Sequence, residues 1–136
     1  MKLRSAAITV VLSSGFALTA CGSDDKTSQT TVEQDTPAVA LAEIPAVKAG
    51  LDKAATEFKS GDAKAAEETV SNTYVDHFEL VEGPLDKVDH ELNEELEEGI
   101  RTELTEEIKS GAPAAKVKKH VDELKADLDT AAEKLQ

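Results

Sequence analysis

The densest group of chemically capable side chains lies between Tyr74 and Glu82, in the run Tyr-Val-Asp-His-Phe-Glu-Leu-Val-Glu. His77 and the carboxylates of Asp76, Glu79 and Glu82 fall within two helical turns of one another. Glu79 and Glu82 are three residues apart, so both project to one side of a helix. Carboxylate oxygens with one imidazole suit iron, manganese or zinc ions. On spacing alone, the simpler interpretation is a boundary histidine beside solvated acids.

On a helical wheel, two of the candidate ligands of this segment lie on different sides of the helix. His77 falls near the edge of the apolar stripe, whereas Glu79 falls opposite it. The two side chains therefore cannot easily bind one ion, and we expect a ligand from another helix.

The next helical region supplies candidate carboxylates. Apolar residues recur there every four positions, at Leu92, Leu96, Ile100, Leu104 and Ile108. A strict four-residue step drifts around a helix, so the apolar arc is broad, and Glu97, Glu103 and Glu107 fall inside it. Buried carboxylates need partners or raised pKa values, and lysines, Tyr74 or a metal ion can fill that role. Alternatively, the apolar arc is narrower than the wheel indicates, and these carboxylates lie outside it. Gly99 costs helix stability in mid-helix and indicates close helix packing.

The chain has no signature of a common enzyme class. It contains no glycine-rich phosphate loop, no Gly-x-Ser-x-Gly and no His-Glu-x-x-His. His120 and Glu123 are three residues apart, but the Glu-x-x-His pairs of di-iron bundles are absent. We therefore expect a protein that is not an enzyme.

The N-terminus resembles a bacterial lipoprotein signal. Lys2 and Arg4 precede an uncharged, mostly apolar stretch that ends in Leu-Thr-Ala before Cys21. The stretch is too short and too polar to span a membrane. We predict that residues 1–20 are a signal peptide and that Cys21 is lipidated, which anchors the chain on the outer side of a bacterial membrane. The alternative is a free or disulfide-forming cysteine after an ordinary signal.

The remaining chain divides into a tether and one domain. Residues 21–36 are mostly polar and predict a flexible tether. Residues 37–136 carry four amphipathic patterns without any strand pattern. The helices are expected from Pro37 to Ser60-Gly61, with a bend or a later start at Pro45, then over about Ala63–Glu82, about His90–Lys109, and from Pro113 onward. Short connections predict an all-α, up-down-up-down four-helix bundle.

Composition narrows the class of partner. The 136 residues carry 15 Lys+Arg and 28 Asp+Glu, which gives a net charge of −13. We expect no nucleic-acid binding, because neutralising phosphates requires clustered basic residues. An acidic surface suits metal ions and basic proteins, and it also suits plain solubility.

Two blocks of residues resemble a known family. They are Tyr74-x-x-x-Phe78-Glu79-x-x-Glu82-x-x-Leu85 and, after an acidic connector, Leu96-Glu97-x-x-Ile100. The pattern is similar to the extracytoplasmic helical domain of bacterial Ftr-type high-affinity iron permeases, over roughly residues 46–128. The resemblance implies that Glu79, Glu82 and Glu97 are the functional carboxylates and that Tyr74 and Phe78 are packing residues.

The permease's membrane-spanning helices and iron-conducting motif are missing, so the resemblance implies a detached, lipid-tethered accessory domain. We expect it to bind or present an iron ion to a permease through Glu79, Glu82 and Glu97, with His77 as a further candidate ligand. The alternatives are an acidic helical envelope module that binds another protein without metal, and a spacer lipoprotein without any ligand.

Overall fold

The structure is a computed structural model that describes residues 35–136, and every regular element in that part of the chain is helical. The all-α prediction is confirmed for these residues. The predicted signal peptide, Cys21 and most of the predicted tether lie outside the described residues. None of the described helices is both long enough and apolar enough to cross a membrane.

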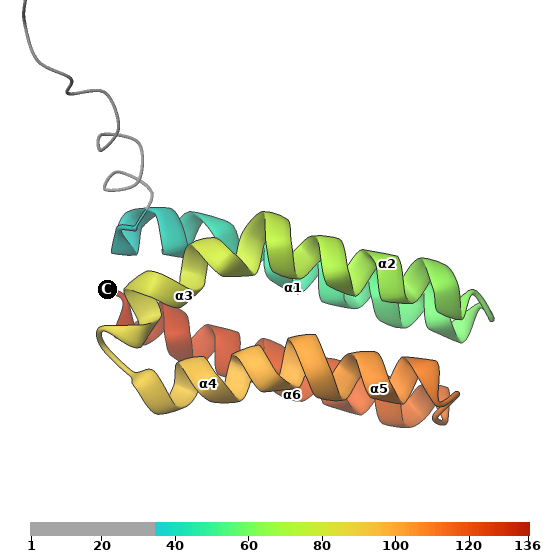
Figure 1. Cartoon of the computed structure of the whole chain (residues 1–136). Helices are drawn as coiled ribbons and strands as arrows, with labels where there is room; N and C mark the ends of the chain where they lie inside the picture. Colours follow the sequence, from blue (N-terminus) through green and yellow to red (C-terminus); the bar gives the residue numbers. More distant parts are fainter. Residues whose placement is uncertain (1–34) are drawn as a thin grey trace, which may run out of the picture.

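Three short turns divide the described helices into four continuous segments (Figure 1). The first is α1 (Pro37–Lys59); the second joins α2 (Ala63–Thr73), the π-helix η1 (Tyr74–Phe78) and α3 (Glu79–Asp86). The third joins α4 (His90–Glu98), the π-helix η2 (Gly99–Glu103) and α5 (Leu104–Lys109), and the fourth is α6 (Ala114–Lys134).

Local sequence signals account for the helix ends. The hydroxyl of Thr36 accepts a hydrogen bond from the backbone N–H of Val39 at 3.3 Å, which caps α1 just before Pro37. Asp62 and Asp89 cap α2 and α4 in the same way. Gly61 follows α1 with a φ of +96°, a conformation that favours glycine. The helix runs through Pro45, so the start at Pro37 holds.

The second segment is longer than the sequence predicts. Gly83-Pro84 was expected to end it near Glu82, yet α3 continues to Asp86. Pro84 and Leu85 are both buried. Packing of these two side chains offsets the backbone hydrogen bond that proline cannot donate.

The segments lie lengthwise beside one another, with α1 and α2 on one side and α4, α5 and α6 on the other (Figure 1). Helix α1 packs against α2, α3 and α6, and α4 packs against α3 and α6. Two ion pairs fix the register of α1 against α6: Lys48 with Asp129 and Lys125 with Asp52, each at 2.5 Å. Because the earlier residue of α1 pairs with the later residue of α6, these two helices run in opposite directions.

The core is aliphatic with one fully buried aromatic ring. Its largest fully buried side chains are Phe78, Leu51, Leu85, Leu96, Ile100, Leu104, Ile108 and Leu128. The apolar side chains of α6 are also buried, at Val117, Val121, Leu124, Leu128 and Ala131. Each π-helix contributes one fully buried side chain to this core, Phe78 from η1 and Ile100 from η2.

Candidate functional site

Two π-helical turns interrupt the middle segments of the fold. The N–H of Glu79 donates to the carbonyl of Tyr74, and the N–H of Leu104 donates to the carbonyl of Gly99. Each bond spans five residues instead of the four of an α-helix. Single π-turns of this kind occur frequently at functional sites.

The η2 turn follows from the apolar spacing around it. Four residues advance about 400° in an α-helix, so each four-residue step drifts by about 40°. The wider π-turn absorbs part of this drift, and all five apolar residues from Leu92 to Ile108 are buried. The apolar arc is therefore narrower than the wheel predicts.

The three acids that the wheel places inside the apolar arc differ in how exposed their side chains are. The side chain of Glu107 is 15 % exposed and lies inside the arc, as the sequence predicts. Glu97 is 37 % exposed and lies at its edge. Glu103 is 60 % exposed, so its predicted burial is wrong. The wheel assumed a regular α-helix, whereas η2 changes the phase of the residues that follow it.

Tyr74 of η1 joins the two middle segments. Its hydroxyl donates a hydrogen bond to Glu82, and Arg101 of η2 lies over its ring, with Cζ 5.7 Å from the ring centroid. Arg101 in turn donates to Glu97 at 2.9 Å. One connected group, which we call the Tyr74 cluster, thus contains Tyr74, Glu82, Glu97 and Arg101.

The pKa of Glu82 depends on its burial and on the charges of two neighbouring carboxylates, Glu79 and Glu97. Burial raises the pKa of Glu82, and the negative charges of Glu97 and Glu79 raise it further against the opposing effects of Tyr74 and Arg101. Burial and the hydrogen bond to Glu82 raise the pKa of Tyr74. The hydrogen bond to Glu97 raises the pKa of Arg101. With the carboxylates ionised, three negative charges face one guanidinium, which favours a cationic ligand.

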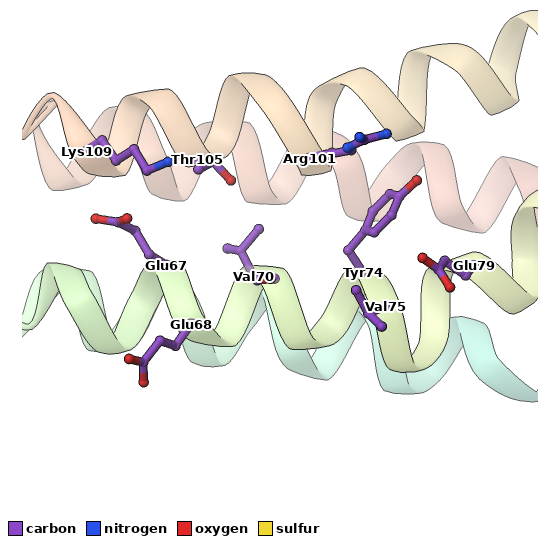
Figure 2. A pocket seen from close by; sticks show the side chains of 10 residues that line it. Glu67, Glu68, Val70, Tyr74, Val75, Glu79, Arg101, Thr105 and Lys109 are labelled. Carbon is purple, nitrogen blue, oxygen red and sulfur yellow. The ribbon is translucent and has the colours of Figure 1, made fainter.

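A groove of about 530 Å³ runs beside the Tyr74 cluster, between α2 and η1 on one side and η2 and α5 on the other. Figure 2 shows Tyr74 pointing across this groove toward Arg101, with Glu79 on the following turn. Val75, 53 % exposed, lines the same groove. Of the three candidate carboxylates, Glu79 lines this groove, whereas Glu82 and Glu97 do not.

Two of the four predicted metal ligands lie in the Tyr74 cluster. Glu82 and Glu97 belong to the Tyr74 cluster, and Glu79 is close enough to affect the pKa of Glu82. His77 is separate from them: its Nδ1 lies 2.7 Å from a carboxylate oxygen of Glu43 on α1. Among residues 35–136, no three His, Cys, Asp or Glu side chains are already arranged to hold one metal ion.

Arg101 is the one member of the Tyr74 cluster that sequence reasoning missed. It follows Glu97 by four residues, a spacing at which opposite charges meet on one helix face. That spacing makes the ion pair predictable. The contact with Tyr74 was not predictable, because it depends on how η1 and η2 face each other.

Comparisons of the chain with models of protein families, with curated proteins and with solved structures find no match.

Proposed function

We propose that this protein is an extracytoplasmic, lipid-anchored accessory protein of iron uptake that binds or presents an iron ion to a membrane permease. One observation carries the proposal. Glu82 and Glu97, from two different helical segments, are linked through Tyr74 and Arg101, and together with Glu79 they outnumber the one positive charge of Arg101. These are three of the residues that the resemblance to the iron-permease domain selects.

The chemistry of the cluster suits iron as a cargo. Carboxylate and phenolic oxygens are hard donors, which iron accepts. Without metal, Arg101 and the Tyr74 hydroxyl hold Glu97 and Glu82. An arriving ion must compete with these bonds, which keeps its binding weak and exchangeable. A protein that hands an ion on needs such release.

The location belongs to the same proposal and is supported by the sequence. Residues 1–20 form the signal peptide, Cys21 carries the lipid, and residues 21–36 hold the domain away from the membrane. Residues 37–136 form an up-down-up-down four-helix bundle. The opposite directions of α1 and α6, the short turns and the arrangement in Figure 1 support this topology.

The test uses Tyr74 as its own reporter, because the chain has one tyrosine and no tryptophan. The purified chain, with Cys21→Ser to remove the thiol as a competing ligand, is titrated with ferrous iron without oxygen and with ferric citrate. Tyrosine emission and calorimetric heat are recorded. The Glu82→Gln/Glu97→Gln variant is compared with Glu106→Gln/Glu133→Gln, which removes two exposed charges elsewhere.

We expect one saturable site that quenches Tyr74 emission. The Glu82/Glu97 variant should lose it, whereas the Glu106/Glu133 variant and His77→Gln should keep it. Equal weak heats in all proteins would mean diffuse attraction to an acidic surface. The iron proposal would then be wrong, and the two metal-free alternatives, a module that binds another protein and a spacer without a ligand, would remain.

A further inference from the structure

A second group of possible ligands lies between the third segment and α6. His120 of α6 sits between two carboxylates of the facing segment. Its Nε2 is 3.6 Å from an oxygen of Glu103, and its Nδ1 is 3.4 Å from Oε2 of Glu107. The imidazole is 14 % exposed. No residue of the Tyr74 cluster belongs to this group.

The inner side of the imidazole has an unmet hydrogen bond. Nδ1 of His120 and Oε2 of Glu107 are both buried, and neither has a hydrogen-bond partner within residues 35–136. Buried polar atoms are costly without a partner. A slight closure of the gap between them gives an Nδ1–H···Oε2 bond. The proton then sits on Nδ1, and the lone pair of Nε2 is left for another ligand.

The outer side of the imidazole has the spacing of a metal site. At 3.6 Å, Nε2 and the Glu103 oxygen are too far apart for a hydrogen bond. Two donor atoms on one tetrahedral zinc ion lie about 3.4 Å apart, given metal–ligand bonds near 2.1 Å. Gly99 lies beside this nitrogen, since a Cβ at that position would be in van der Waals contact with Nε2 at 3.7 Å.

The surrounding groove favours a dication. It has a volume of about 580 Å³ and is lined by five acids and two lysines besides His120. The acids are Glu95, Glu103, Glu107, Glu123 and Asp127; the lysines are Lys116 and Lys119. With the imidazole neutral, three negative charges remain uncompensated. Lys116 lies 3.2 Å from Oε1 of Glu107 and so balances the buried carboxylate rather than the outer ones.

We propose that His120, Glu103 and Glu123 bind one divalent transition-metal ion of the zinc class, with Glu107 as the residue that orients the imidazole. Glu123 follows His120 by one turn of α6, lines the same groove and is 58 % exposed. Its ion pair is with exposed Lys119, so it can rotate toward Nε2. A histidine that binds a metal through one nitrogen and donates the other N–H to a carboxylate is the usual arrangement at such sites.

The test is a calorimetric titration of the purified chain, again with Cys21→Ser, with zinc chloride in the presence of 100-fold excess magnesium. The variants are His120→Gln, Glu103→Gln and Glu107→Gln. His90→Gln is the matched control, because His90 also sits between two carboxylates, Asp86 at 2.5 Å and Glu94 at 3.3 Å, but on the exposed surface. The imidazole signals of His120 are followed by NMR in the same titration.

We expect one zinc ion per chain, bound at Nε2. His120→Gln and Glu103→Gln should weaken binding at least tenfold, and Glu107→Gln about tenfold to a hundredfold. His90→Gln should change it less than twofold. Because Glu103 is largely exposed, its variant leaves the core intact if His120→Gln unfolds the chain. Equal weakening in the His90 variant, displacement by magnesium, or unmoved His120 signals would overturn the proposal.

Discussion

Glu82 is held where its own charge is unfavourable. Its side chain is partly buried and accepts a hydrogen bond from the Tyr74 hydroxyl. The carboxylates of Glu79 and Glu97 lie close enough to raise its pKa. The ionised form of Glu82 therefore lowers the stability of the fold. A carboxylate with a raised pKa at a partly buried position is a candidate functional group.

The pH dependence of stability should reveal this cost. The pKa of Glu82 is raised above its ordinary value near 4.5, so the native state binds its proton more readily than the unfolded state. Ionisation of Glu82 therefore lowers the free energy of unfolding as pH rises through the native pKa. Glu82→Gln removes this loss, and its stability relative to the parent should increase from pH 4 to pH 7. Urea unfolding in EDTA measures the difference.

Glu57 provides a control of opposite sign. The hydrogen bond from Thr69 and the ion pair with Lys53 lower the pKa of Glu57. Its interactions stabilise the fold above its ordinary pKa and are lost as pH falls. Glu57→Gln should therefore lose stability relative to the parent as pH rises. A pH-independent difference for Glu82→Gln would contradict our interpretation of the Tyr74 cluster.

At the scale of the element, the two π-turns decide which residues face each other. Without η2, the four-residue spacing of apolar residues would carry Ile108 out of the core. With it, the apolar residues stay buried and Glu103 turns outward. Both π-turns also carry functional candidates: Tyr74 and His77 on η1, Arg101 and Glu103 on η2.

Gly99 tests the packing of η2 against α6. A Cβ at this position would lie 2.6 Å from Cδ2 of Leu124, a buried side chain. We expect Gly99→Ala to destabilise the fold by about 1–3 kcal/mol through overpacking, although alanine favours helix by about 1 kcal/mol. Thermal unfolding followed by circular dichroism measures the change.

Gly83 of α3 is the matched control. There a Cβ would meet Oδ1 of Asp35, the end of an exposed side chain that can move away. Gly83→Ala should be neutral or stabilising. If Gly99→Ala also stabilised the fold, the close packing of η2 on α6 would be wrong.

At the scale of the whole molecule, charge opposes the compact state. The net charge is −13, and many of the ion pairs join residues four apart on one helix, each worth about 0.2–0.5 kcal/mol. Such pairs do little against repulsion across the whole surface. The aliphatic core and the inter-helix pairs, such as Lys48 with Asp129, hold the segments together.

Salt should therefore stabilise this protein. Raising NaCl from about 10 mM to 0.5 M shortens the Debye length from about 30 Å to a few ångströms, which screens the repulsion among acidic residues. We expect Tm to rise by roughly 5 °C, which corresponds to about 1 kcal/mol in a domain of this size. A fall in Tm would mean that the ion pairs contribute more than the repulsion removes.

The helical class and most of the helix boundaries follow from local features of the sequence. Thr36, Asp62 and Asp89 cap helices through bonds to residues three positions away, and Gly61 ends a helix through its own φ. These interactions join residues close together in the sequence, so they do not depend on how the helical segments pack. The sequence also selected Glu79, Glu82 and Glu97 as candidates, and it indicated close packing at Gly99.

Which of the candidate side chains lie close together depends on how the helical segments pack. It paired His77 with Glu43 of α1 and placed Tyr74 between Glu82 and Arg101. It also set His120 between Glu103 and Glu107. Apart from the bond between Tyr74 and Glu82, these contacts join different helical segments. Which side chains face each other across the segments depends on the π-turns, which a regular helical wheel does not contain. The packing of four helices over one core, rather than any local preference, fixes that arrangement.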